Sequence, residues 1–110
     1  MINLKTAQKI HVDQLYNKNQ YVITYFDNGV MYWAFQSYQS LICIYCPSTK
    51  EMAVNWCKFD YSKTTSKHLK IFINEYTCYK YETLKQFTGF IKSNNNIVLF
   101  NEWERTKRTG

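Results

Sequence analysis

Apolar positions near the start of the chain are compatible with two different elements. Over residues 1–16, a helix would collect one apolar face from Leu4, Ala7, Ile10 or His11, and Leu15. Ile10 and Val12 would instead open a strand, because they alternate with polar residues. We expect a short helix in this segment.

Two β-branched and aromatic runs, residues 21–26 and 30–35, flank Asp27-Asn28-Gly29 and predict a hairpin. A two-residue turn at Asn28-Gly29, whose positive φ angles suit both residues, pairs Phe26 with Met31, Thr24 with Trp33 and Val22 with Phe35. Side chains alternate along strands, so these six share one face. The other face then carries Tyr21, Ile23, Tyr25, Tyr32 and Ala34.

Two more apolar runs, residues 41–46 and 52–57, are separated by Pro47-Ser48-Thr49 and read as strands. After Ser62 the spacing becomes helical, with apolar positions at Leu69, Phe72, Ile73 and Tyr76. This predicts a helix over residues 63–76 whose N-cap is Ser62, Thr64 or Thr65.

A second helical pattern ends near Ser93 and gathers Tyr81, Leu84, Phe87 or Thr88, and Ile91 on one face. Asn94-Asn95-Asn96 then supplies a turn, and residues 97–100 form a last strand. The charged residues 104–110 are expected to fray.

Together these elements predict an α+β fold. An antiparallel β-meander of about four strands is followed by one or two helices packed on the sheet and by a C-terminal strand. The 110 residues contain one proline and three glycines, with no linker or internal repeat, so we expect a single domain over residues 1–110.

Charge and hydropathy limit the classes of partner. Lysine and arginine outnumber aspartate and glutamate by 14 to 8, and the formal charge of +6 favours polyanionic partners. No apolar stretch is long enough to cross a membrane, and the first residues lack the apolar region of a secretory signal. We therefore expect a cytoplasmic protein without a membrane partner.

The cysteines and histidines do not predict a catalytic or metal site. Cys43 and Cys46 have the CxxC spacing, but they lie in a strand pattern that sends them to opposite faces, and no common zinc module has the spacing of Cys57, His68 and Cys78. We expect free, mostly buried thiols in a reducing compartment and no metal or cofactor. No nucleophile motif surrounds either histidine, so we expect that the protein is not an enzyme.

The best candidate chemistry is contact with a nucleic acid. Lys63, Lys67 and Lys70 fall on one side of the predicted helix, and hydroxyls at its start, from Ser62, Thr64 and Thr65, lie where free N–H groups attract phosphate. Tyrosines of the hairpin, Tyr21, Tyr25 and Tyr32, could stack bases if their face is exposed. The ordinary alternatives are a solvated helix face, helix capping and a tyrosine-rich core.

Residues 59–72 also carry a family resemblance. The segment Phe59-Asp60-Tyr61-Ser62-Lys63-Thr64-Thr65-Ser66-Lys67-His68-Leu69-Lys70-Ile71-Phe72 resembles a DYSxTTxKHxxxF signature of small uncharacterised proteins from phages and mobile elements of Gram-positive bacteria. Residues 35–42 are similar to the FxSYxxxIA stretch of those proteins, with Cys43 where alanine is usual. The resemblance implies a mobile-element context and no known activity.

Charge and context together favour a non-catalytic nucleic-acid-binding accessory protein. The alternative is a protein-binding inhibitor or adaptor that acts on a host factor or on a defence nucleoprotein, for example of the CRISPR type. Tyrosine and tryptophan suit both, because they dominate protein interfaces and also stack bases.

Overall fold

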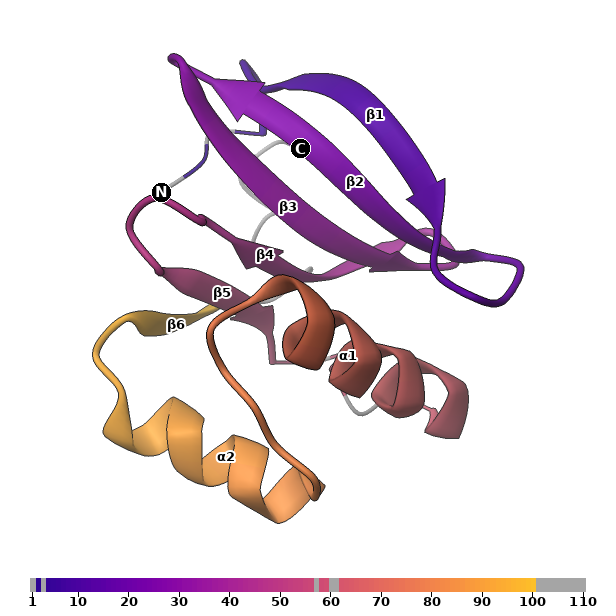
Figure 1. Ribbon diagram of the computed structural model, residues 1–110, viewed down its shortest axis with the longest axis vertical. Helices are drawn as coiled ribbons and strands as arrows, with labels where there is room; N and C mark the ends of the chain where they lie inside the picture. The colour runs from indigo at the N-terminus through magenta and orange to yellow at the C-terminus, as the bar shows by residue number, and fades with distance from the viewer. Residues whose placement is uncertain (1, 3, 57, 60–61, 101–110) are drawn as a thin grey trace.

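A six-stranded mixed sheet forms the centre of the computed structural model, which describes residues 2, 4–56, 58–59 and 62–100. Its strands lie in chain order: β1 (Gln8–Gln14), β2 (Gln20–Asp27), β3 (Val30–Ser37), β4 (Ser40–Tyr45), β5 (Met52–Asn55) and β6 (Ile97–Phe100). The first five form an antiparallel meander. The chain then runs through α1 (Lys63–Tyr76) and α2 (Leu84–Ser93) before β6 joins β5 in parallel (Figure 1). The predicted α+β class is confirmed, and so is the order of elements from the hairpin onward.

The β2–β3 hairpin has the predicted turn and register. Asn28 and Gly29 have φ angles of 52° and 79°, the left-handed values that a tight two-residue hairpin turn requires. Phe26, Thr24 and Val22 face Met31, Trp33 and Phe35, as the alternation predicts. A one-residue slip would move each apolar side chain to the wrong face, so the turn chemistry and the two-sided core specify the same register.

The helix expected within residues 1–16 is wrong, because Gln8–Gln14 form the edge strand β1. β1 pairs with β2 through register partners such as Val12 with Ile23, with a bulge between Lys9 and His11. The backbone N–H and C=O groups on the outer side of β2 gain hydrogen-bond partners in this way, a tertiary term that outweighs a weak local helical pattern. All seven β1 residues are exposed, which explains the indistinct sequence signal.

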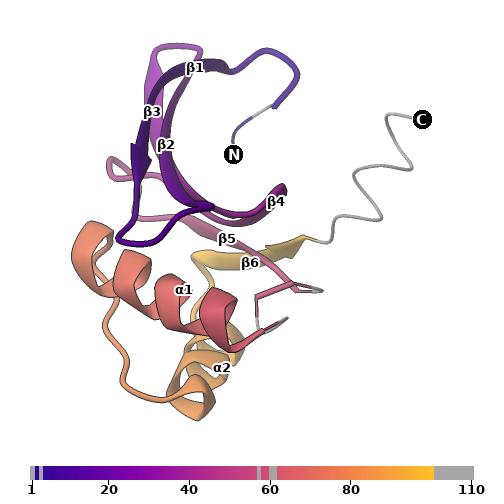
Figure 2. The ribbon, with the colours of Figure 1, turned by 90° about the vertical axis from the view of Figure 1, so that its right-hand side faces the viewer.

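The sheet has a buried layer on each face. The helix-facing layer includes Phe35, Phe72 and Phe87, all with no exposed surface. The opposite layer includes Tyr25, Tyr32 and Ile44, and residues from the start of the chain, Ile2, Leu4 and Ala7, pack against it. Figure 2 shows the strands curving around this N-terminal segment, while both helices lie on the other side.

Both helices begin at capping residues. The Ser62 side chain caps α1, and Thr83 with Gln86 forms a capping box on α2. α2 therefore starts three residues after Tyr81, and its buried side comes from Phe87, with Phe90 and Ile91 partly buried. The prediction that Leu84 lies on this apolar face is wrong, because Leu84 is exposed.

Two of the sequence-based expectations fall on residues that the structure does not describe. The tail at 104–110 and Cys57 lie outside the described residues. Among the described residues, neither helix combines the length and apolar character needed to span a membrane.

Candidate functional site

The start of α1 uses two of its three candidate hydroxyls for structure. Ser62 Oγ accepts a hydrogen bond from the Thr65 backbone N–H at 3.1 Å and donates to Thr65 Oγ1 at 3.1 Å. Thr65 Oγ1 also lies 3.0 Å from Ser37 Oγ, which ties the first turn of the helix to the end of β3. Ser62 and Thr65 are therefore capping and packing groups first, whereas Thr64 is exposed.

The three candidate lysines differ in their surroundings. Lys63 and Lys67 are exposed on α1, four residues apart and so on one side of the helix. Lys70 Nζ lies 3.4 Å from a carboxylate oxygen of Glu82, which partly neutralises its charge. A surface ion pair of this kind contributes little stability. It does mean that the charge of Lys70 is less available to a ligand than the charges of Lys63 and Lys67.

The three candidate tyrosines also differ in their exposure. Tyr25 and Tyr32 are 8% and 7% exposed, and they sit opposite each other in the hairpin within the buried layer that the N-terminal segment covers. Burial raises the pKa of the Tyr32 hydroxyl. Neither ring offers a face on which a base could stack. Tyr21, which is half-buried, packs against the same layer and also lines a pocket.

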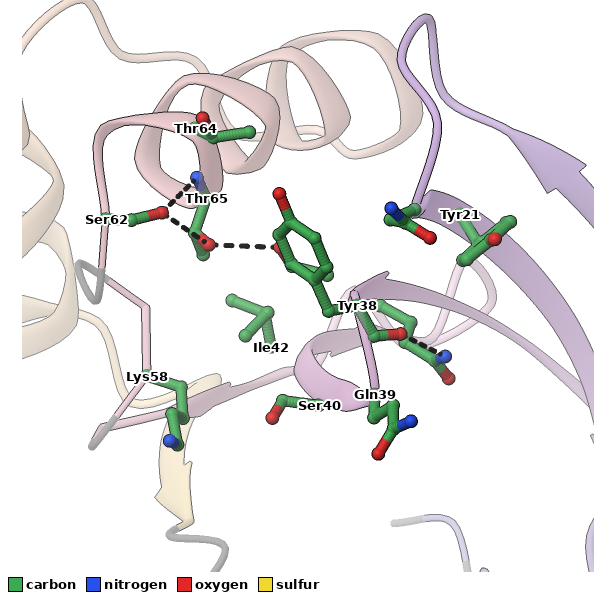
Figure 3. Close-up of a pocket in the computed structure, with 12 residues that line it drawn as sticks. Tyr21, Tyr38, Gln39, Ser40, Ile42, Lys58, Ser62, Thr64 and Thr65 are labelled. Carbon is green, nitrogen blue, oxygen red and sulfur yellow. Dashed lines mark hydrogen bonds between the residues drawn. The ribbon is translucent and has the colours of Figure 1, made fainter.

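A pocket of about 860 Å³ lies between the start of α1, the turn that joins β3 to β4, and the beginning of β2 (Figure 3). It brings together four of the nine candidate residues: Tyr21, Ser62, Thr64 and Thr65. Lys58 supplies a cation and Ile42 an apolar wall. Among the described residues that line this pocket there is no carboxylate. Its volume lies within the usual range for small-molecule sites.

Tyr38 and Gln39 complete the pocket, and neither was among the nine candidate residues. They form the two-residue turn between β3 and β4, and Figure 3 shows the Tyr38 ring standing between the start of α1 and Tyr21. The Tyr38 backbone N–H donates to the Asn19 carbonyl oxygen at 2.6 Å, and the Gln36 side-chain amide donates to the Tyr38 carbonyl oxygen at 2.7 Å. The available signals were the tyrosine of the FxSYxxxIA stretch and a five-residue gap without glycine, residues 36–40, between two strand patterns.

Cys43, Cys46 and His68 take part in packing. Cys43 and Cys46 belong to opposite buried layers, as the strand alternation predicts, and with the exposed Cys78 they are free thiols. His68 is buried in α1, with Nδ1 2.8 Å from the Thr64 carbonyl oxygen. Across the ranges that the structure covers, no three potential metal-binding side chains cluster.

Comparison with known proteins gives a family without a known activity. No curated protein and no solved structure that was searched matches the chain. A model described as a family of unknown function (DUF8033) matches residues 5–89, most of the sequence, and the protein therefore belongs to that family.

Proposed function

We propose that this protein is a non-catalytic nucleic-acid-binding accessory protein of a phage or mobile element, and that it contacts the phosphate backbone at the start of α1. The observation that carries the proposal is the pocket beside that helix end. It combines hydroxyls, a lysine and aromatic rings, with no carboxylate among its described lining residues.

The start of α1 suits an anion for two physical reasons. The first N–H groups of a helix have no partner inside the helix, and the helix dipole gives that end a partial positive charge. The Ser62 side chain satisfies only the N–H of Thr65 among these groups, and the first turn contains no acidic residue. Lys63 beside the helix end adds positive charge, and Lys58 lines the pocket. A phosphate group would offset this concentration of positive charge.

Lys67 extends the positive surface along the helix. It lies one turn after Lys63 on the same side, and both are exposed. Lys70 would be a third contact, but its pairing with Glu82 weakens its claim. We therefore expect two strong backbone contacts from α1 itself, supported by the net charge of +6.

A salt titration tests the proposal. Binding of fluorescent single-stranded and duplex DNA and RNA is measured for the wild type, for Lys63→Gln/Lys67→Gln, and for Lys85→Gln/Lys92→Gln. Lys85 and Lys92 are exposed on α2, so the control removes the same charge elsewhere. Each lost phosphate contact should flatten the slope of log K against log salt by about 0.7 for single strands or 0.9 for duplexes. Equal slopes for the two double variants would show that Lys63 and Lys67 contact phosphates no more than the control lysines do, and would contradict the proposal.

A protein-binding inhibitor or adaptor is the second candidate, and the edges of the sheet favour it. Ile10 and Val12 are exposed on β1, and Val98 and Leu99 on β6. An edge strand with exposed apolar side chains can pair through its backbone with a strand from a partner protein. In pull-downs from host lysate, a host protein retained after nuclease and lost with Val12→Asp would favour this function. Loss of all partners after nuclease favours nucleic-acid binding.

A further inference from the structure

The turn between β3 and β4 holds an aromatic ring where the backbone favours glycine. Tyr38 has a φ of 56°, while Gln39 is not among the residues with positive φ. Positive φ at only the first central position is the pattern of a type II′ hairpin turn, in which glycine is usual. A tyrosine there is strained, and the surrounding hydrogen bonds keep the turn in place.

The strained residue points its side chain to solvent rather than to the core. The Tyr38 side chain is 54% exposed, although the turn joins two strands whose apolar residues are mostly buried. Packing therefore does not account for an aromatic residue at this position. Its ring lines the pocket and stands between Tyr21 and the start of α1 in Figure 3.

The groups around Tyr38 match the parts of one nucleotide. A base has a flat π-face and an edge of hydrogen-bond donors and acceptors. Aromatic rings hold the face, and amide side chains such as that of exposed Gln39 pair with the edge. Lys58 and the Thr64 hydroxyl line the same pocket, and a cation and a hydroxyl suit the phosphate group of the same nucleotide.

We infer that the pocket holds one unpaired nucleotide of a single-stranded nucleic acid, with its base stacked on Tyr38 and its phosphate toward the start of α1. This inference rests on the proposed function and narrows it, because the faces of bases inside a duplex are covered by their neighbours. The strip of Lys63 and Lys67 would bind any backbone, whereas Tyr38 selects strands whose bases are free to leave the stack.

The backbone strain supplies a variant that separates binding from folding. Tyr38→Gly removes the ring and places the residue that the turn prefers, and it retains the main-chain N–H that bonds to Asn19. We expect its melting temperature to equal or exceed that of the wild type. Tyr38→Phe keeps the ring and serves as the matched control.

The ligand can be varied in the same way. Affinities are measured for a single-stranded oligonucleotide, for an abasic strand of equal length that keeps every phosphate, and for the corresponding duplex. Tyr38→Gly should bind the single strand about 5- to 150-fold more weakly, the range for the loss of one stacked base, while Tyr38→Phe stays close to the wild type. The abasic strand and the duplex should bind both variants as they bind the wild type.

Two outcomes would overturn the inference and remain distinguishable. If Tyr38→Gly binds the single strand as tightly as the wild type, while the Lys63→Gln/Lys67→Gln variant loses affinity, the pocket does not hold a base and backbone binding stands. If the wild type binds none of the three ligands at low salt, the proposed function and the inference both fail.

Discussion

Replacing Phe72 with alanine tests how α1 is fixed to the sheet. Phe72 has no exposed surface, and it stacks on Phe35 of β3 and on Tyr76 of its own helix, with ring centroids 5.9 Å and 5.4 Å away. Truncating a buried phenylalanine to alanine costs about 3 to 5 kcal/mol, from lost burial and from the cavity that remains.

The neighbours of Phe72 place the expected cost toward the upper end of that range. Phe35 is fully buried in a central strand, and Leu69 and Ile73 beside it on α1 are fully buried as well. Such a site cannot collapse far into the cavity, so less of the loss is recovered. A domain of this size has a free energy of unfolding of about 5 to 15 kcal/mol, so the variant should keep only part of it.

Thermal and urea unfolding followed by circular dichroism measure the effect. At about 4 °C per kcal/mol for a domain of this size, a cost of about 4 to 5 kcal/mol should lower the melting temperature by roughly 16 to 20 °C. Lys67→Ala on the exposed side of the same helix is the control, and it should change stability by less than about 0.5 kcal/mol. A melting temperature of Phe72→Ala within 2 °C or so of the wild type would refute the packing of α1 through this face.

Two further predictions concern thiols and tyrosines. Iodoacetamide should label exposed Cys78 quickly under native conditions and leave Cys43 unlabelled until denaturant is added, because burial raises the pKa of the Cys43 thiol and blocks access. Peptide mass mapping measures the labelling of both thiols. Equal labelling rates would contradict the placement of Cys43 in a buried strand. Burial raises the pKa of Tyr45 to about 12, so the native state favours the neutral hydroxyl. This preference contributes fully to the free energy of unfolding below about pH 10, the ordinary pKa of tyrosine. Urea midpoints should therefore fall as the pH rises from about 10 through 12, and less so in Tyr45→Phe; equal pH dependence in both proteins would argue against this burial effect.

The elements that the sequence predicts well are those in which local and tertiary preferences agree. Asn28-Gly29 demands a tight turn, and the strand alternation on both sides serves two buried layers, so the register follows from the pattern alone. α1 begins and ends where the cap and the apolar spacing indicate. β1 is different, because an exposed edge strand has no buried side to leave a pattern, and only its pairing with β2 defines it.

The candidate site was predictable only where it coincides with a local motif. Ser62, Thr64 and Thr65 follow from the helix start, but the pocket that joins them to Tyr21 depends on the distant β3–β4 turn. The alternation of β2 and β3 puts Tyr25 and Tyr32 on one face, yet it cannot show that the strand curvature and residues from the chain start bury that face. Glu82 opposite Lys70 comes from the α1–α2 connection, whose path no spacing rule fixes.

The pocket lies between the turn that follows β3 and the start of α1, and a hydrogen bond links these two elements. Ser37, at the end of β3, and Thr65, in the first turn of α1, join across it through their buried hydroxyls at 3.0 Å. This contact fixes the first turn of α1 relative to the end of β3, and a pre-positioned site loses less conformational entropy on binding. Strain at Tyr38 is tolerable for the same reason, since hydrogen bonds to Asn19 and Gln36 hold the turn from either side. One helix carries both sets of residues. Its pocket residues lie at its start, and its core residues Leu69 and Phe72 lie on the side that faces the sheet. Substitutions of exposed Lys63 or Tyr38 should therefore change binding without loosening the core, and substitutions of Phe72 should weaken both together.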